Sequence, residues 1–210
     1  MTAPVGILGG TFDPVHCGHL AVAEYVWAHC ALAQIQFLPC LLPPHRQPPR
    51  ASPAQRLAMI RLAIAGHPDW IVNDIDFQRP GPSYMIDTLT ILRQQQPQTP
   101  WCLLLGMDAF AHFNQWRQWQ KILQLAHLIV VNRPGCHLSS SGWEPALLRD
   151  TQARSADDLT QSLAGKILIQ EMPPCDISAT AIRQKFPTSA ATIALPPEVL
   201  QYIKQHHLYL

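Results

Sequence analysis

The feature that most constrains the fold is a run of eleven residues near the start of the chain, Gly9-Gly10-Thr11-Phe12-Asp13-Pro14-Val15-His16-Cys17-Gly18-His19. It follows an apolar run, Val5 to Leu8, and precedes a segment with helical apolar spacing that begins at Leu20. This order predicts a strand, a tight loop and a helix, with two glycines turning the chain close to a ligand. Because the first N–H groups of a helix are unpaired and its dipole is positive outward, we expect a phosphate-binding loop with open amides.

Two histidines, His16 and His19, lie three residues apart in this loop, and we expect both side chains to face the bound anion. An imidazole can donate a hydrogen bond to phosphate, act as acid or base, or bind a metal. Neither Asp13, which precedes a proline, nor Cys17 is suitably placed as a third metal ligand. We therefore predict no metal ligated by the protein here, although the spacing alone also fits a structural pair.

Other known phosphate-binding loops fit this run less well. No Gly-x-Gly-x-x-Gly occurs in it, which argues against a dinucleotide-binding dehydrogenase, and no Gly-Lys-Ser/Thr follows, which argues against a P-loop. Instead, Thr11-Phe12-Asp13-Pro14 followed by His16-x-Gly18-His19 resembles the signature of the nucleotidylyltransferase superfamily that carries a His-x-Gly-His motif.

Composition excludes several classes of protein. With 210 residues, 48% of them hydrophobic, the chain can bury a substantial core, and we expect one domain over residues 1–210. A formal net charge of +1 argues against nucleic acid or an anionic membrane as a partner. The apolar runs have strand length and the first residues lack a signal-peptide pattern, so we expect a cytoplasmic enzyme.

The cysteines and histidines give no further sign of a metal or disulfide framework. The six cysteines, at positions 17, 30, 40, 102, 136 and 175, include no Cys-x-x-Cys pair, and we interpret them as free thiols. Apart from His16, His19 and the pair His206-His207, the histidines are scattered, which does not favour a metal site.

Strand and helix patterns alternate along the rest of the chain. Predicted strands cover residues 35–38, 71–75, 101–105, 128–131 and 166–171, and predicted helices cover 20–30, 53–65, 84–95, 122–126, 145–149, 197–205 and a segment opened by 177–183. Residues 39–50, with five prolines, read as a surface loop, and 136–163 as a variable excursion. The alternation predicts an α/β fold: a Rossmann-like, doubly wound, mostly parallel sheet with helices on both faces.

In such a sheet, ligands bind beyond the carboxyl ends of the strands. Residues 11–19, His45, Asp108, Arg133 and residues 178–183 all follow predicted strands, so we expect them at one edge of the sheet.

Ser178, Thr180 and Arg183 open a predicted helix, where hydroxyls, amides and a guanidinium can hold a polyphosphate. Ordinary helix capping is the alternative, because Ser and Thr are preferred caps. The run Ile177-Ser178-x-Thr180-x-Ile182-Arg183 resembles the second phosphate-binding motif of the same superfamily.

Further motifs resemble, in order along the chain, those of the bacterial nicotinate-nucleotide adenylyltransferases: Pro43-Pro44-His45-Arg46, Pro82-Ser83-Tyr84 with Thr88-Leu89, Gly106-x-Asp108, Trp116, and His127 to Val131 with Arg133-Pro134-Gly135. The likeness covers nearly the whole chain except residues 136–163. It implies an enzyme of NAD biosynthesis that transfers the AMP group of ATP to nicotinate mononucleotide, giving deamido-NAD and pyrophosphate.

The resemblance also implies roles for individual residues. It makes His16, His19 and Arg183 catalytic. It places around ATP the residues Gly9, Gly10, Thr11, Phe12, His16, His19, Gly106, Asp108, Ile177, Ser178, Thr180 and Arg183. It places around nicotinate mononucleotide the residues His45, Arg46, Tyr84, Met85, Trp116 and Arg133. We expect Mg²⁺ to be held chiefly by the ATP phosphates, because the sequence shows no compact carboxylate cluster. A homo-oligomer is compatible with the sequence.

Two positions depart from the family pattern. Met85 stands where a polar residue is usual, which leaves the preference for nicotinate over nicotinamide open, and Leu41-Leu42 stands where an asparagine is frequent. Two alternatives remain: a phosphopantetheine adenylyltransferase, whose first motif usually has Thr in place of His16, and a nucleotide-binding module without turnover.

Overall fold

A computed structural model of the chain describes residues 2–43, 47–132 and 142–210. Its strands are β1 (Val5–Gly10), β2 (Gln34–Pro39), β3 (Trp70–Val72), β4 (Trp101–Gly106), β5 (His127–Asn132) and β6 (Ile167–Glu171). Its α-helices are α1 (Cys17–Cys30), α2 (Pro53–Ile64), α3 (Met85–Gln95), α4 (Met107–Ala111), α5 (Trp119–Leu125), α6 (Glu144–Thr151), α7 (Ala179–Lys185), α8 (Ser189–Ile193) and α9 (Pro197–Gln205). Short 3₁₀ helices are η1 (Ile75–Gln78), η2 (Phe113–Gln115) and η3 (Ala156–Thr160).

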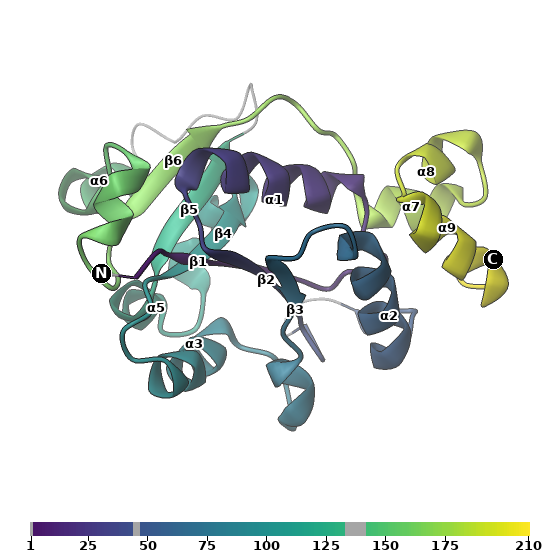
Figure 1. Cartoon of the computed structure of the whole chain (residues 1–210), viewed down its shortest axis with the longest axis horizontal. Coiled ribbons are helices and arrows are strands. Elements are labelled where there is room, and N and C mark those ends of the chain that lie inside the picture. Colours follow the sequence, from purple (N-terminus) through teal and green to yellow (C-terminus); the bar gives the residue numbers. More distant parts are fainter. Residues whose placement is uncertain (1, 44–46, 133–141) are drawn as a thin grey trace. The chain divides into compact units, whose positions relative to one another are not determined.

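The strands of the described residues form one six-stranded sheet in the order β3-β2-β1-β4-β5-β6 (Figure 1). The pairs β1–β4, β4–β5 and β5–β6 are parallel. This strand order, with its reversal between β1 and β4, is that of a doubly wound Rossmann-like sheet. The predicted α/β fold class is therefore confirmed.

The chain divides into two compact units. The first takes its described residues from 1–8, 25–35 and 84–174, and the second from 9–24, 36–83 and 175–210. In the first unit, β4 and β5 are buried almost throughout, as expected for apolar strands of a parallel sheet. Helices α3 and α5 pack side by side in this unit (Figure 1). None of the described helices has the length and apolar character that a membrane span needs.

In the second unit, the helix predicted after Ser52 is confirmed as α2. The Ser52 hydroxyl accepts the N–H of Gln55 at 3.3 Å, and the Gln55 side chain accepts the N–H of Ser52 at 2.8 Å. This reciprocal pair is a capping box, and Pro53 occupies the first helical position, where its missing N–H costs nothing. Helix α2 packs against α9 within the unit.

The third strand of the chain ends earlier than the sequence pattern indicates. The strand expected over residues 71–75 ends at Val72, and Ile75 opens a 3₁₀ turn instead. The cause is Asn73, whose side-chain oxygen accepts the N–H of Ile75 at 3.1 Å and so turns the backbone out of the sheet.

Three predicted helices begin earlier than expected, α6 by one residue at Glu144, and two α-helices were missed. Helix α1 begins at Cys17 rather than Leu20, and α5 begins at Trp119, after Gln118 in the left-handed region at φ 52°. The short helices α4 and α8 were not predicted, because five residues are too few to show an apolar period.

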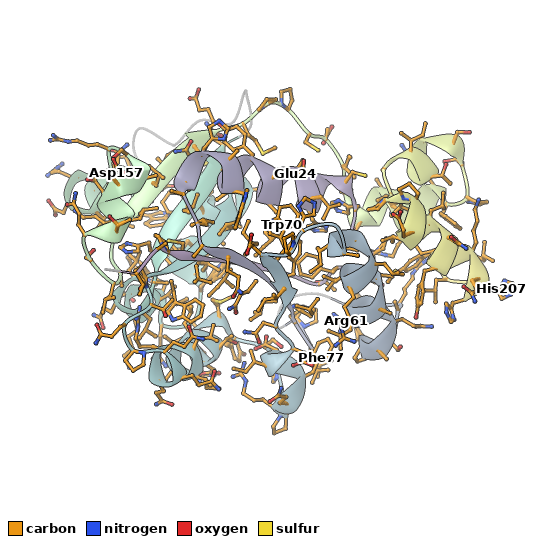
Figure 2. All side chains as sticks on the ribbon, in the orientation of Figure 1. Glu24, Arg61, Trp70, Phe77, Asp157 and His207 are labelled. Atoms are coloured by element: carbon orange, nitrogen blue, oxygen red, sulfur yellow. The ribbon has the colours of Figure 1, made fainter. Side chains whose placement is uncertain are left out.

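The last helix, α9, has the predicted bounds and ends in a Schellman motif. The Leu208 N–H donates to the Ile203 carbonyl at 3.0 Å, and the His207 N–H donates to the Lys204 carbonyl at 3.3 Å. His207 lies beyond the end of α9 (Figure 2) and has a φ of 50°, in the region that favours glycine.

Replacing His207 by glycine is expected to raise the free energy of unfolding by about 0.5–1 kcal/mol, because glycine adopts this conformation at a lower cost. Urea denaturation measures the difference. The matched control is His206→Gly, because His206 has a φ of −99° and gains nothing from glycine. A less stable H207G protein would contradict this account of the helix end.

Candidate active site

In the second unit, the side chain of Phe12 anchors the loop between β1 and α1. Phe12 has a φ of 51°, and only 1% of the residue is exposed. Its ring packs edge-on against the imidazole of His19, with centroids 4.8 Å apart, and lies 5.9 Å from the ring of Phe37. A left-handed conformation costs a residue with a side chain about 1 kcal/mol or more, so burial of this ring helps to hold the turn.

The two histidines of the loop lie together. Their rings stack with centroids 3.7 Å apart, and the backbone N–H of His16 donates to Nδ1 of His19 at 3.3 Å. Because Nδ1 accepts, we assign the proton of neutral His19 to Nε2. That tautomer leaves an Nε2–H group that can donate to a phosphate oxygen.

The protonation of His19 follows from its surroundings. Burial, with a smaller contribution from the His16 imidazole, lowers the pKa of His19 well below the usual value for histidine. His19 is therefore neutral at pH 7 in the free protein. Neutral His19 already carries a proton on Nε2, so it is suited to bind a phosphate as a donor without a change of protonation state.

Gly18 permits a close approach between the loop and the segment before α7. A Cβ atom at this position would lie 3.0 Å from Nδ1 of His16 and 3.3 Å from Cβ of Ile177. Both contacts are tighter than side chains normally make, so a larger residue would displace the His16 ring. Ile177, predicted to contact ATP, thus lies against the first turn of α1.

The N-terminus of α1 offers fewer open amides than the sequence analysis predicted. The N–H of Cys17 donates to the carbonyl of Ala194 at 2.9 Å, and the N–H of His19 donates to the carbonyl of His16 at 2.9 Å. The prediction of unpaired amides throughout this turn was therefore wrong. The physical reason is that the end of α8 supplies a carbonyl that local sequence does not reveal.

The predicted second phosphate motif lies in the same unit, at the start of α7. Ser178 caps this helix, because its hydroxyl accepts the N–H of Ala181 at 3.2 Å. Arg183 donates from Nη2 to the hydroxyl of Thr180 at 3.4 Å and from Nη1 to the carbonyl of Asp13 at 2.7 Å. The structure thus brings the two motifs together, and it also confirms the capping role of Ser178.

Asp13 is a central residue that the sequence analysis did not assign. Its buried carboxylate accepts the N–H groups of Arg50 at 2.9 Å and Ala51 at 3.0 Å, and the hydroxyl of Tyr209 at 2.7 Å. Nε of Arg183 lies 3.9 Å from the same carboxylate. Asp13 thereby joins the loop to three other segments of the second unit. The signal available in the sequence was its place inside the Thr-Phe-Asp-Pro run.

Arg56 of α2 is a second residue that the sequence did not mark. Its guanidinium, in a residue only 1% exposed, donates to the carbonyls of Thr11 at 2.8 Å, Cys40 at 2.7 Å and Leu41 at 3.3 Å. It also lies 5.2 Å from the ring centroid of Phe77. These carbonyls are partly buried, and one planar guanidinium supplies a donor to all three.

The residues that begin the loop have defined but modest contacts. The carbonyl of Gly10, beside Gly9 at the end of β1, accepts the N–H of Cys40 at 2.9 Å, and the Cys40 thiol lies 3.7 Å from the Thr11 hydroxyl. A Cβ atom on Gly10 would lie 3.1 Å from the Phe12 ring. Because Gly10 has no side chain, the buried ring of Phe12 can occupy the space beside it.

The first unit carries Gly106 and Asp108, at the end of β4 and in the first turn of α4. Both are exposed. A Cβ atom on Gly106 would lie 2.5 Å from Oδ1 of Asp108, so glycine is required for this carboxylate to lie over the start of the helix.

Tyr84, Met85 and Trp116 also belong to the first unit. Tyr84 and Met85 open α3, and the partly exposed Trp116 packs against Phe113 with centroids 5.5 Å apart. The guanidinium of Arg117, which the sequence analysis did not single out, lies 4.8 Å from the Tyr84 ring centroid.

The Arg117 guanidinium is also 3.7 Å from the carboxylate of Asp87. In the sequence, Arg117 was indicated only by its position next to Trp116, a predicted ligand residue. The predicted ligand residues His45, Arg46 and Arg133 lie outside the described residues.

The cluster in the second unit is made of hydrogen-bond donors. Three donors in this cluster are suited to an anion with several oxygens: the Nε2–H of His19, the guanidinium of Arg183 and the hydroxyl of Thr180. In the described ranges, no group of three or more histidine, cysteine or acidic side chains is placed to hold a metal ion. The chemistry of the side chains therefore fits a polyphosphate better than a bare cation.

Comparison with known proteins gives close relatives. The cytidylyltransferase-like family matches residues 7–185. A protein of Coxiella burnetii named "Probable nicotinate-nucleotide adenylyltransferase" is 46% identical over 209 residues, covering 98% of this chain and 97% of its own. A protein of Aeromonas hydrophila with the same name is 42% identical over 207 residues, covering 98% and 97%.

Solved structures share the fold. The nicotinic acid mononucleotide adenylyltransferase of Plasmodium falciparum complexed with NaAD has a TM-score of 0.76 at 15% identity, covering 99% of this chain and 98% of its own. The same enzyme complexed with APC has a TM-score of 0.72 at 16% identity, covering 99% and 98%.

The lowered pKa of His19 predicts how stability depends on pH. The folded protein holds this imidazole neutral, whereas the unfolded chain protonates it below about pH 6.5. The free energy of unfolding should therefore fall on acidification below that value, by at most about 1.4 kcal/mol per pH unit for each such group. Burial lowers the pKa of His127 as well, so that residue contributes with the same sign.

The His19→Asn protein should lose less stability than the wild type between pH 7.5 and 5.5. Urea denaturation across that range measures the two slopes. The exposed His206 provides the control variant His206→Asn, which removes an imidazole from solvent rather than from the interior. Equal slopes for H19N and the wild type would contradict the assigned state of His19.

Proposed function

Because the chain belongs to the cytidylyltransferase-like family, and within it to the nicotinate-nucleotide adenylyltransferases, we propose that it transfers the AMP group of ATP to nicotinate mononucleotide and that the donor cluster of the second unit holds the triphosphate. The products are nicotinate adenine dinucleotide and pyrophosphate. One observation supports this assignment of the site: the loop of His16 and His19 meets the segment 177–183 in one unit, through the hydrogen bond from Arg183 to the Asp13 carbonyl and the close approach of Gly18 to Ile177.

The proposed reaction needs positioning more than activation. An oxygen of the mononucleotide phosphate attacks the α-phosphorus of ATP, the bond from that phosphorus to the bridging oxygen breaks, and the electron pair leaves with pyrophosphate. The nucleophile is already an anion, so no protein base is required. His19 Nε2–H and Arg183 donate to oxygens on which negative charge grows, and holding the two anions in line supplies much of the rest.

The remaining ATP contacts are proposed from the family motifs. Gly9 and Gly10 let the backbone approach the nucleotide, while the residues Thr11, Phe12, His16, Gly106, Asp108, Ile177 and Ser178 complete the set. Mg²⁺ would neutralise phosphate charge and would be held chiefly by ATP oxygens, because the cluster offers donors rather than carboxylates. Three further expectations stay predictions: that nucleic acid and membranes are not partners, that the protein is cytoplasmic, and that it forms a homo-oligomer.

Nicotinate mononucleotide would be bound by Tyr84, Met85 and Trp116, with Trp116 stacking on the pyridine ring. His45, Arg46 and Arg133 are further proposed contacts. Arg117 supports the preference for the acid over the amide, because its guanidinium is a cation held beside Tyr84. In this proposal the side chain of Met85 takes no polar part in selectivity.

Pyrophosphate release tests the function directly. Purified protein with Mg-ATP is offered nicotinate mononucleotide, nicotinamide mononucleotide or phosphopantetheine, and the product is identified by mass. We expect the highest rate with nicotinate mononucleotide. Release with phosphopantetheine alone would favour the other adenylyltransferase, and no release with any acceptor would favour a binding module.

Replacing His19 or Arg183 by alanine is expected to lower kcat/KM by about 10² to 10³-fold, the usual cost of removing a well-placed donor. The same assay gives the rates. Lys185→Ala, which removes an exposed positive charge from the same helix as Arg183, is the control and should change the rate little. Losses below tenfold in both variants would refute their assigned roles.

Arg117→Met should lower the ratio of kcat/KM for nicotinate over nicotinamide mononucleotide by about 5- to 30-fold, because a charge-assisted contact of roughly 1–2 kcal/mol is lost. Lys121→Met, an exposed lysine on the following helix, is the matched control. An unchanged ratio in R117M would assign acid recognition to other groups.

A further inference from the structure

Tyr209 contacts the candidate active-site loop from the far end of the sequence. Its hydroxyl donates to Oδ1 of Asp13 at 2.7 Å across 196 sequence positions, and the residue is only 8% exposed. A buried tyrosine hydroxyl bonded to a carboxylate is a charge-assisted hydrogen bond, roughly twice as strong as a neutral one. The contact is therefore a specific one rather than apolar packing alone.

The backbone after α9 is shaped to make this contact. The Schellman motif at Ile203, Lys204 and Leu208 ends the helix, with His207 in the left-handed region. Tyr209 is left-handed as well, with a φ of 64°. Two non-glycine residues in this conformation carry a cost that the contacts of the segment must offset. The buried ring and its hydroxyl bond are contacts of this kind.

Asp13 connects Tyr209 to the groups that are proposed to bind phosphate. Oδ2 of its carboxylate accepts the N–H of Arg50, and Oδ1, the oxygen that Tyr209 contacts, accepts the N–H of Ala51. The backbone carbonyl of Asp13 accepts Nη1 of Arg183 at 2.7 Å. The residue stands three positions before His16 in the loop. A displacement of Asp13 would therefore move Arg183 and the histidines together.

The charges around Tyr209 keep its hydroxyl a donor. Burial and the adjacent Asp13 carboxylate raise the pKa of Tyr209 far above neutrality, although Arg183 and Arg56 oppose this shift. The hydroxyl of Tyr209 is therefore protonated at neutral pH and can donate to Asp13.

We propose that Tyr209 is a positioning residue for adenylyl transfer, which holds the carboxylate of Asp13 and thereby aims Arg183 and the His16–His19 loop at the triphosphate. The proposal rests on the proposed function of that loop. Tyr209 acts only through Asp13 and is given no contact with substrate.

Tyr209→Phe removes the hydroxyl and keeps the ring, so it tests the contact with little loss of packing. We expect kcat to fall about 10- to 100-fold, because misplacing reacting groups by about 1 Å has effects of that size. The KM for nicotinate mononucleotide should stay within about twofold, since no contact with that substrate is lost. Tyr202→Phe, the same change on α9, is the matched control.

A double-variant comparison separates positioning from a merely structural role. Because Tyr209 acts in part through Arg183, adding Tyr209→Phe to Arg183→Ala should lower kcat by a smaller factor than Tyr209→Phe does in the wild type. All rates are measured at a temperature at which circular dichroism shows every variant folded. If Y209F does not fold, the same comparison is made in the His207→Gly background.

An unchanged kcat in Y209F would overturn the proposal, and so would a full additional loss in the double variant. Amide hydrogen exchange at Arg50 and Ala51 gives a readout that does not depend on turnover, and Y209F should accelerate it. An inactive wild type would contradict the proposed function, whereas unchanged exchange in Y209F would contradict the role of Tyr209.

Discussion

The second unit depends on one buried carboxylate. Asp13 receives two backbone amides, the hydroxyl of Tyr209 and, at its carbonyl, the guanidinium of Arg183. Burying a charge is costly unless its oxygens find donors, so the segments that supply these donors are held in place by the same requirement. Arg56 meets the complementary need, because it supplies donors to three carbonyls of neighbouring loops. The positions of His16 and His19 follow from these two polar centres.

The chemistry of the cluster matches the reaction of its family. Two anions must come together at the α-phosphorus, and the groups on hand are donors that need not change protonation state beforehand. Neutral His19 illustrates this, since its Nδ1 is occupied by the loop and its Nε2–H is left for a ligand. The local hydrogen bonds of the fold thus orient the donor groups, and the nucleophile is a phosphate oxygen of the substrate.

Local patterns in the sequence predicted much of the fold. Apolar runs located β4 and β5, and capping residues located the starts of α2 and α7, because these signals lie within a few residues of the structure they form. The end of β3 was predicted wrongly, although a local signal for it was available in Asn73. Arg56 and Tyr209 could not be found in this way, because the partners of Arg56 are 15, 16 and 45 positions away and the partner of Tyr209 is 196 positions away. For the same reason the carbonyl of Ala194, which occupies the Cys17 amide, was not anticipated.

The separation of Asp13 from Tyr209 has a consequence for the order of synthesis. The loop that carries Asp13, His16 and His19 leaves the ribosome early. The partners of Asp13 are synthesised much later, because Arg183 lies 170 positions after Asp13 and Tyr209 lies 196 positions after it. Closing loops of this length is slow compared with forming local helices and turns. During translation the nascent loop therefore lacks its distant partners, and the groups proposed to bind phosphate reach their final positions among the last events of folding.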